Sequence, residues 1–378
     1  MRKLSKAEIE VFGERLEAMR AESLAKVGEK DARYIRSLIG FQRLLDIGSR
    51  LVMACAFLFL SGAVMWIIAL LATIGLAVSK ILNNMEIGHN VMHGQYDWMN
   101  DPNINSVKFD WDIAGDSDSW RRYHNYEHHT FTNVLGKDRD FGYGLLRLSD
   151  DYKWKPKNRF QIFTYLALSF FFEWGVAYHE LAAERVFMGK KKRDSELPIS
   201  RKELRNAFFK KAGKQVFKDY IFFPLLFLPV ALPVLICNFI ANMLRNLWTS
   251  TIIFCGHFTE GAHVFYEKDI QNETRGEWYY RQILGSSNIE GSKAFHIMTG
   301  HLSPPSGPAE PGGFDFQRHA YFAGLGAVGY TRTPVLRAQA AQSDGWRLWI
   351  FSKRMQISRA VQAAMPGETG AFAAAIMT

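Results

Sequence analysis

One stretch of the chain, residues 51–79, runs for 29 positions without a charged side chain. A charge-free apolar stretch favours passage through a bilayer, because one spanning helix needs about 20 apolar residues. This stretch is long for one span and short for two. Adding residues 41–50 in front and 80–83 behind gives room for a helical hairpin whose turn is at Ser61 and Gly62. Such a hairpin returns the chain to the side of the membrane on which it started.

A second apolar region, residues 220–258, contains one charge, Arg245, in 39 positions. Its length is enough for two spans, and membrane helices tolerate its prolines when neighbouring helices satisfy the backbone. We therefore predict an all-α polytopic membrane protein with about four transmembrane helices and a cytosolic helical cap. The predicted spans cover about 44–61, 63–82, 220–238 and 241–258.

Residues 160–179 are apolar but include Gln161 and Glu173, and the segment that follows, 180–218, contains twelve Lys or Arg. Because Lys and Arg concentrate in cytosolic loops, a full crossing by 160–179 would place that basic segment outside. We therefore expect a membrane-surface or re-entrant helix there. The same rule places the first fifty residues and residues 84–159, with eleven and ten Lys or Arg, in the cytosol.

The composition limits the class of protein. The mean hydropathy of −0.12 excludes a chain that is mostly embedded, and the net charge of +9 fits attraction to an anionic membrane surface. With apolar spans present, we expect no nucleic-acid partner. The three cysteines lie in apolar runs and indicate no disulfide framework. The first forty or so residues are rich in charge, unlike a cleaved secretory signal. The apolar spans predict an integral membrane protein, in the inner or plasma membrane if it is bacterial.

Three regions follow from these patterns. Residues 1–43 have helical apolar spacing and predict a cytosolic amphipathic region. Residues 44–303 form the predicted membrane domain. Residues 304–378 contain one Lys and six Arg and are rich in Ala, Gly and Pro, so we expect a poorly ordered tail.

Five of the eleven histidines lie between residues 89 and 129. We call His89–His93 box 1 and His124–His129 box 2. Histidines four residues apart lie on one face of a helix, so each box can direct two imidazoles to one metal ion. On an α-helix His129 points about 100° away from His128, toward a second ion. With one more histidine at the end of the last span, the candidate ligands are His89, His93, His124, His128, His129 and His257.

Imidazole suits Zn, Cu, Fe and Ni, so the ligand type alone does not name the metal. Six imidazoles exceed the need of one tetrahedral zinc ion, and two ions beside a membrane suggest an oxidative centre acting on a lipid. Nearby acidic residues, Glu86, Glu127 and Asp140, are candidate partners for the ring N–H groups. We expect the isolated histidines to be ordinary surface or core residues: His179, His263 and His319.

The sequences GHNVMHG and HNYEHHTFTN resemble the first two histidine boxes, HxxxH and HxxxHH, of the membrane fatty acid desaturases. NMEIGHNVMHGQYDWMNDP and NLWTSTIIFCGHF are similar to the bacterial acyl-CoA or acyl-lipid branch described as linoleoyl-CoA desaturase-like. The resemblance covers roughly residues 40–303. It implies four membrane helices with a cytosolic cap and two non-haem iron ions (Fe²⁺). By this resemblance the iron ligands would be His89, His93, His124, His128, His129 and His257.

The resemblance also implies an O₂-dependent reaction that removes two hydrogens from an acyl chain carried by coenzyme A or by a lipid. Aromatic residues around the boxes could line the acyl channel: Tyr96, Trp98, Trp111, Trp120 and Phe131. No dinucleotide or cytochrome motif is visible. We therefore expect a separate electron donor, a ferredoxin-, rubredoxin- or b-type cytochrome-like carrier, together with its reductase.

One element of the family pattern is missing. The family has a third box, (H/Q)xxHH, but here MTGHLS is followed by PPSGPAEPGG, and no adjacent histidine pair follows His129. His296 and His301 remain as substitute ligands, although five residues on a helix separate them by about 140°. We hypothesise that the tail after residue 303 arises from a frameshift, a truncation or a gene-model error, which resequencing of the locus tests.

Two alternatives therefore stay open beside a desaturase. One is a membrane hydroxylase or ketolase on the same scaffold, which product analysis separates. The other is a degenerate homologue without catalysis, because losing two imidazoles should weaken metal binding.

Overall fold

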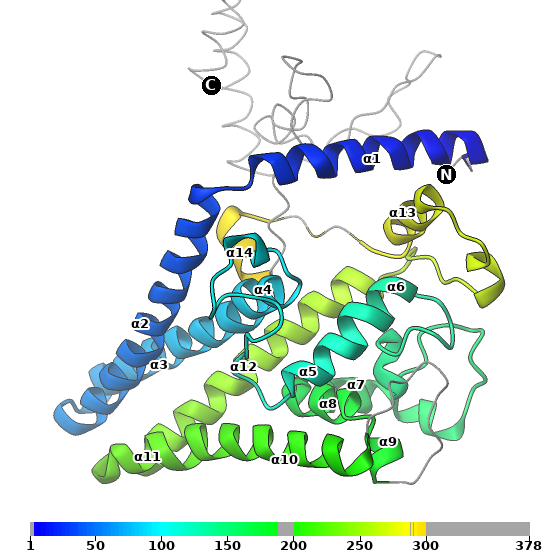
Figure 1. The fold of residues 1–378 in the computed structure, drawn as a ribbon. Helices are drawn as coiled ribbons and strands as arrows, with labels where there is room; N and C mark the ends of the chain where they lie inside the picture. Colours follow the sequence, from blue (N-terminus) through cyan, green and yellow to red (C-terminus); the bar gives the residue numbers. More distant parts are fainter. Residues whose placement is uncertain (1–3, 188–199, 288, 290, 300–378) are drawn as a thin grey trace, which may run out of the picture. The chain divides into compact units, whose positions relative to one another are not determined.

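The computed structural model describes residues 4–187, 200–287, 289 and 291–299, all within one compact unit, Met1–Ser303. Every regular element in these residues is a helix (Figure 1). An isolated bridge between Val134 and Phe265 is the only β-type pairing that the described part of the chain contains. The predicted all-α fold is confirmed, while the predicted tail, 304–378, lies outside the described residues.

The long helices are α1 (Lys6–Lys26), α2 (Glu29–Phe59), α3 (Gly62–Ile81), α10 (Arg201–Val216) and α12 (Ala231–His257). The shorter α-helices are α4 (Asn90–Met92), α5 (Ser117–Trp120), α6 (His129–Phe131), α7 (Gln161–Phe170), α8 (Phe172–Glu180), α9 (Ala183–Val186), α11 (Phe223–Leu226), α13 (Arg275–Leu284) and α14 (Lys293–Thr299). Three segments are π-helical: η1 (Leu82–His89), η3 (Arg121–His128) and η6 (Phe217–Phe222). The 3₁₀ turns are η2 (Asp97–Met99), η4 (Phe141–Gly144), η5 (Pro156–Phe160), η7 (Leu228–Val230) and η8 (Glu267–Ile270).

Helices α2 and α3 form the predicted hairpin. Helix α2 ends at Phe59, α3 begins at Gly62, and Gly62 has a φ of +61°, which a residue without a Cβ adopts at no steric cost. The two helices pack closely enough that a Cβ on Gly75 would lie 2.6 Å from Oγ of Ser49. The hairpin leads directly into η1 and therefore delivers box 1 to the end of α3.

The second apolar region differs from the predicted pair of helices, 220–238 and 241–258. The break lies earlier, at Phe227–Val230, and α12 then runs without interruption from Ala231 to His257. The reason is proline placement: Pro229 lies in the break, and Pro233 lies in the first turn of α12, where a missing N–H costs nothing. No helix breaker occurs at residues 239–240.

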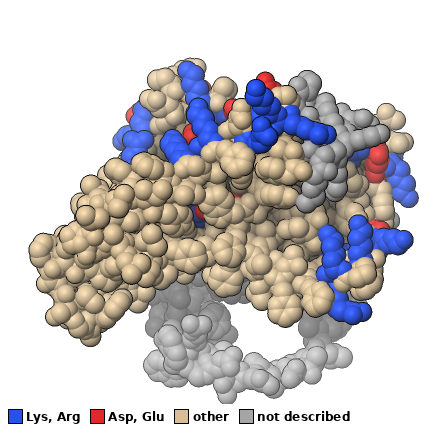
Figure 2. Space-filling model, turned by 90° about the horizontal axis from the view of Figure 1, so that it is seen from below, with Lys and Arg blue, Asp and Glu red and all other residues tan. Residues whose placement is uncertain are grey.

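Two helical stretches, Gly62–Met92 and Leu228–His257, are long and apolar enough to cross a membrane. A third candidate is the pair Pro156–Phe170 and Phe172–Glu180, which is bent by 95° and fits either a broken span or a re-entrant loop. Figure 2 shows the face of the molecule that lies at the bottom of Figure 1. One end of this face carries no Lys or Arg, while basic residues gather elsewhere on it. The described part of the chain therefore contains two or three candidate spans, and four spans remain a prediction.

Two groups of charged residues inside the helical bundle form ion pairs. Arg50 on α2 and Lys80 on α3 both contact Asp219 on η6, at 3.1 and 2.7 Å, and all three side chains are buried. Arg245 on α12 pairs with Glu173 on α8 in the same way. Removing one partner of a buried pair costs about 3–5 kcal/mol, so these pairs hold the helices that carry the site in a defined register.

Candidate metal centre

Box 1 lies where α3 continues through η1 into α4. Ile87, Val91 and Met92 are fully buried in the core, so they fix the rotation of this segment. His89 ends η1 and His93 follows α4, and their Nε2 atoms are 3.1 Å apart. The two rings of box 1 therefore point toward one place, as the spacing predicted.

Box 2 lies on η3 and the start of α6. The backbone N–H of His129 donates to the carbonyl of His124, five residues earlier, as a π-turn requires. This wider turn brings residues five apart onto one face, and Nε2 of His129 lies 3.2 Å from Nε2 of His124. We expected α-helical geometry, with His129 directed away toward a second ion. The structure instead places His129 beside His124.

The six predicted ligands come together from three separate parts of the chain. The ring centroids of His93 and His129 are 4.7 Å apart and join the two boxes, and those of His128 and His257 are 4.8 Å apart. Nitrogen atoms of His89, His93 and His124 all lie within 4.8 Å of one another. Among the described residues, no comparable group of three ligands includes His257. The cluster is therefore denser on the side of box 1 than on the side of α12.

Two carboxylates orient the rings of box 2. Asp140 lies 2.9 Å from Nδ1 of His124, and Asp138 lies 3.0 Å from Nδ1 of His128. A carboxylate on Nδ1 fixes the tautomer in which Nε2 is free to bind a metal ion. Asp140 is one of the predicted partners. Glu86, another of them, instead accepts a hydrogen bond from Tyr34 at 2.6 Å.

Sequence reasoning missed Asp138 and His179. Asp138 supports His128 directly, and Nε2 of His179 lies 3.3 Å from the second oxygen of Asp140. The available signal was the KDRD segment, which begins eight residues after box 2 and in which two aspartates alternate with basic residues. For His179, no local pattern exists, because it comes from α8.

Burial keeps part of the cluster uncharged. Burial, together with the neighbouring His124 and His128, lowers the pKa of His93 to about 3, and the same effects lower the pKa of His129. Burial acts in the same direction on His128, but Asp138 and Asp140 outweigh it and raise the pKa of His128 to about 9. Neutral imidazole is the metal-binding form. A set of neutral imidazoles without thiolates fits iron, zinc, copper or nickel by donor type.

Trp120 covers one side of the cluster. Its ring stacks on His124 with centroids 4.5 Å apart and lies edge-on to His89 and His93 at 5.8 and 5.3 Å. Trp111 packs against Trp120 at 5.0 Å. Of the other aromatic residues expected near the boxes, Tyr96 is buried in a separate apolar cluster and Trp98 is exposed.

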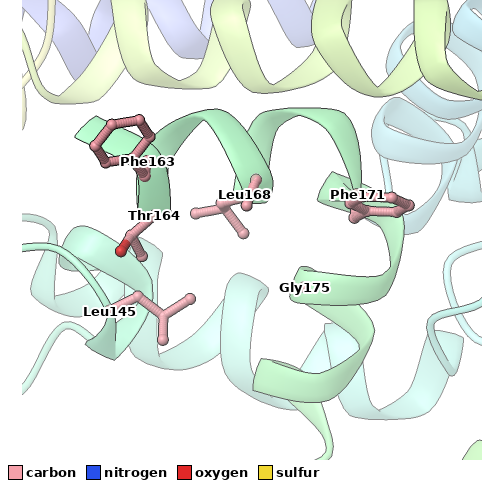
Figure 3. Close-up of a pocket in the computed structure, with 7 residues that line it drawn as sticks. Leu145, Phe163, Thr164, Leu168, Phe171 and Gly175 are labelled. Atoms are coloured by element: carbon pink, nitrogen blue, oxygen red, sulfur yellow. The ribbon is translucent and has the colours of Figure 1, made fainter. Parts of the chain in front are cut away.

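An apolar hollow of about 550 Å³ lies at the bend between α7 and α8 (Figure 3). Phe163, Leu168 and Phe171 line it from the helices, and Leu145 lies opposite. A Cβ on Gly175 would lie 2.5 Å from Cδ1 of Leu168, so glycine allows the two helices to meet at this angle. Helix α8 extends from the hollow to His179, which joins this apolar surface to the supports of box 2.

A family model described as fatty acid desaturase matches residues 35–303, which include both boxes and α12. The chain belongs to the fatty acid desaturase family. Members of this family are oxidoreductases of lipid metabolism, and iron and a membrane location are implied by the family.

Three curated relatives of this desaturase are similar over most of their length. NADPH-dependent stearoyl-CoA 9-desaturases from two strains of Mycobacterium tuberculosis are 44% identical over 303 residues, covering 79% of this chain and 68% of each relative. An sn-1 linoleoyl-lipid 6-desaturase from Synechocystis sp. is 28% identical over 309 residues, covering 78% of this chain and 82% of the relative. No solved structure matches significantly.

Of the two substitute ligands for the missing third box of this desaturase, His296 lies in the described residues, and no ring contact or metal group there joins it to the six histidines. His296 lies on α14 with its ring beside Phe295, 5.9 Å between centroids, and belongs to neither candidate metal group. His301 and His319 lie outside the described residues. The six histidines of the boxes and α12 are therefore the observed candidate set.

Proposed function

We propose that this chain is an O₂-dependent desaturase that introduces a double bond into a fatty acyl chain carried by coenzyme A. The reaction would take place at two non-haem iron ions held by the six clustered histidines. The observation that carries the proposal is the convergence of both boxes and His257 on one place, with Asp138 and Asp140 on the outer nitrogens. Coenzyme A is favoured over a lipid carrier because the relatives named for stearoyl-CoA are 44% identical and the one named for a lipid is 28% identical.

Bound iron with O₂ would supply the oxidant that an unactivated C–H bond requires. The chain's own residues hold and shield the site. Asp140 and Asp138 keep Nε2 of His124 and His128 directed inward. Trp120 covers the rings of His89, His93 and His124 and excludes water from that side. Precise holding of the acyl chain beside such a site accounts for attack at one carbon pair.

Location and partners complete the proposal. The α2–α3 hairpin and α12 anchor the chain in the membrane, with the metal centre on the cytosolic side, in agreement with the basic residues around the boxes. Electrons come from a separate ferredoxin-, rubredoxin- or b-type cytochrome-like carrier and its reductase. The word NADPH-dependent in the name of two relatives favours NADPH as the ultimate source.

Expression of the full chain in a host without desaturases, followed by mass spectrometry of its fatty acids, tests this function. We expect new monounsaturated acyl chains, and we expect His93→Ala and His128→Ala to abolish them. His263→Ala is the control, since its ring lies outside the cluster. Hydroxylated products in place of alkenes would support a hydroxylase on the same scaffold.

A degenerate homologue without catalysis is the second candidate, because no adjacent histidine pair follows His129. Iron analysis of the purified chain separates the two. About two iron ions per chain together with new double bonds support the desaturase. Little iron and no product support the degenerate homologue, and recovery of both on adding a third box to the tail would locate the defect.

A further inference from the structure

Asn133 ends the segment that carries box 2, immediately after α6. It is buried, and its φ is +57°, in the left-handed region that asparagine tolerates better than most residues. Figure 1 shows α6, the upper end of α12 and α13 close together at this place. The residue therefore lies where three parts of the cap meet.

The side-chain amide of Asn133 faces backbone carbonyls from two other segments. Its Nδ2 lies 2.8 Å from the carbonyl oxygen of Gly285, 3.1 Å from that of His263 and 3.5 Å from that of His257. Only the NH₂ end of an amide can face three acceptors, so the orientation of the group is determined. One side chain thereby connects box 2 to the end of α12 and to the end of α13.

The backbone of Asn133 supports the other side of the same junction. Its N–H donates to Oδ2 of Asp138 at 2.8 Å, and Asp138 in turn contacts Nδ1 of His128 at 3.0 and 3.1 Å. Its carbonyl accepts from the N–H of Phe265 at 2.9 Å. Asn133 thus contacts both the carboxylate that orients His128 and the backbone of His257. The ring centroids of these two histidines are 4.8 Å apart.

We propose that Asn133 is a positioning residue that sets His257 against His128. These two imidazoles come from segments more than a hundred residues apart in the sequence. Their relative placement therefore depends on what connects the segments. The proposal takes from the proposed function only that His128 and His257 bind a metal ion.

The test is a titration of the metal-free full chain, in detergent, with Co²⁺, whose visible absorption reports its coordination. His93→Ala and His257→Ala assign the spectral changes to the ion at box 1 and to the ion at His128 and His257. Asn133→Asp keeps the shape but turns a donor into an acceptor against three carbonyls. Asn133→Gly keeps the backbone conformation but removes the amide.

We expect both substitutions to lower the affinity for the ion assigned to His257 by about 10- to 100-fold, the usual effect of losing a hydrogen-bond partner of a metal ligand. The ion at box 1 should change by about twofold or less, with helix content unchanged. The matched controls are Asn272→Asp and Asn272→Gly, because Asn272 also has a left-handed φ, +59°, but lies in an exposed loop outside the site. The controls should bind both ions like the wild type.

The proposal is overturned if both Asn133 variants bind Co²⁺ with the affinity of the wild type. This holds whether the chain binds one Co²⁺ ion or two. It is also overturned if the two variants lower the affinity for both ions equally, because an equal loss indicates general destabilisation of the protein. A wild-type chain that makes no double bonds, combined with selective loss in the Asn133 variants, refutes the proposed function and leaves the role of Asn133 intact.

Discussion

Asp138 and Asp140 each hold a ring of box 2 through Nδ1, and they differ in their other contacts. Asp138 also accepts from the N–H groups of Asn133 and Asp140, at 2.8 and 2.9 Å, whereas Asp140 reaches His179. Both aspartates lie in the one short segment between α6 and η4, so their carboxylates have few alternative positions. Their contribution to metal binding should therefore be visible in single substitutions.

We expect Asp138→Asn and Asp140→Asn to reduce metal affinity by about 10- to 100-fold, since an amide keeps the size but loses the charge that strengthens the hydrogen bond. Metal retained by the purified chain during competition with a chelator measures the change. Asp118→Asn is the control, because Asp118 is exposed and pairs with Arg121 on the surface. Unchanged retention in the Asp138 and Asp140 variants would refute their assigned role.

Tyr34 on α2 donates to Glu86 beside box 1, at 2.6 Å. Burial, followed by the hydrogen bond to Glu86, raises the pKa of Tyr34 above its ordinary value near 10. The folded state therefore holds this proton more tightly than the unfolded state. The resulting stability is complete below about pH 10 and falls as the pH rises further.

We expect Tyr34→Phe to destabilise the protein by about 1–3 kcal/mol at neutral pH, because it leaves a buried carboxyl without its donor. The variant should also lose less stability than the wild type between about pH 10 and 11. Thermal unfolding across this range measures both effects. Tyr126→Phe serves as the control, since Tyr126 is exposed, and equal alkaline losses in all three chains would contradict the assignment.

At the scale of elements, α13 connects the N-terminal helix to box 2. Arg281 donates to the carbonyls of Thr130 and Thr132 at 2.8 and 3.2 Å, and Gln282 donates to that of His129 at 2.9 Å. On its other side α13 packs on α1, where a Cβ on Gly13 would lie 2.5 Å from Cα of Gly276. The position of α1 therefore depends on two facing glycines.

We expect Gly13→Ala to separate α1 from α13 at a cost of about 1–3 kcal/mol, because the clash is with backbone that cannot rotate away. Faster limited proteolysis within α1 and a lower melting temperature measure the effect. Gly48→Ala is the matched control: Gly48 is also inside a helix but has open space around its added Cβ, so alanine should be neutral or stabilising by up to about 1 kcal/mol. Equal behaviour of the two variants would show that the facing glycines do not matter.

The parts of this fold that local patterns predict are those that depend on spacing along the chain. The hairpin turn at Ser61–Gly62 follows from a charge-free length, and the approach of His89 to His93 follows from a four-residue step. Asp138 and His179 were not predictable in this way, because their role depends on how a loop and α8 return to box 2. The predicted break at residues 239–240 lies too late in the chain. It was placed by dividing the apolar length into two spans, whereas the position of the prolines decides where the helix breaks, at Phe227–Val230.

At the scale of the whole molecule, the arrangement in the membrane is the largest untested prediction. In a variant without its three native cysteines, Ser61→Cys at the hairpin turn should react with an impermeant maleimide added outside intact cells. Val107→Cys, exposed between the two boxes, should react only after the membrane is opened. The reverse pattern would place the metal centre on the opposite side, against the distribution of Lys and Arg.

The π-turns at both boxes make the site depend on the number of residues as well as on their chemistry. A π-turn already holds one more residue than an α-turn, so inserting one alanine after Tyr126 in η3 would leave His124 and His129 six residues apart and rotate His128 and His129 by about 100° relative to His124. Every histidine would remain, yet we expect metal binding to be lost, while Tyr126→Ala, which keeps the length, should retain it. A comparison of metal content in the two variants tests this. If the expectation holds, insertions in these two helices are under stricter constraint than most substitutions.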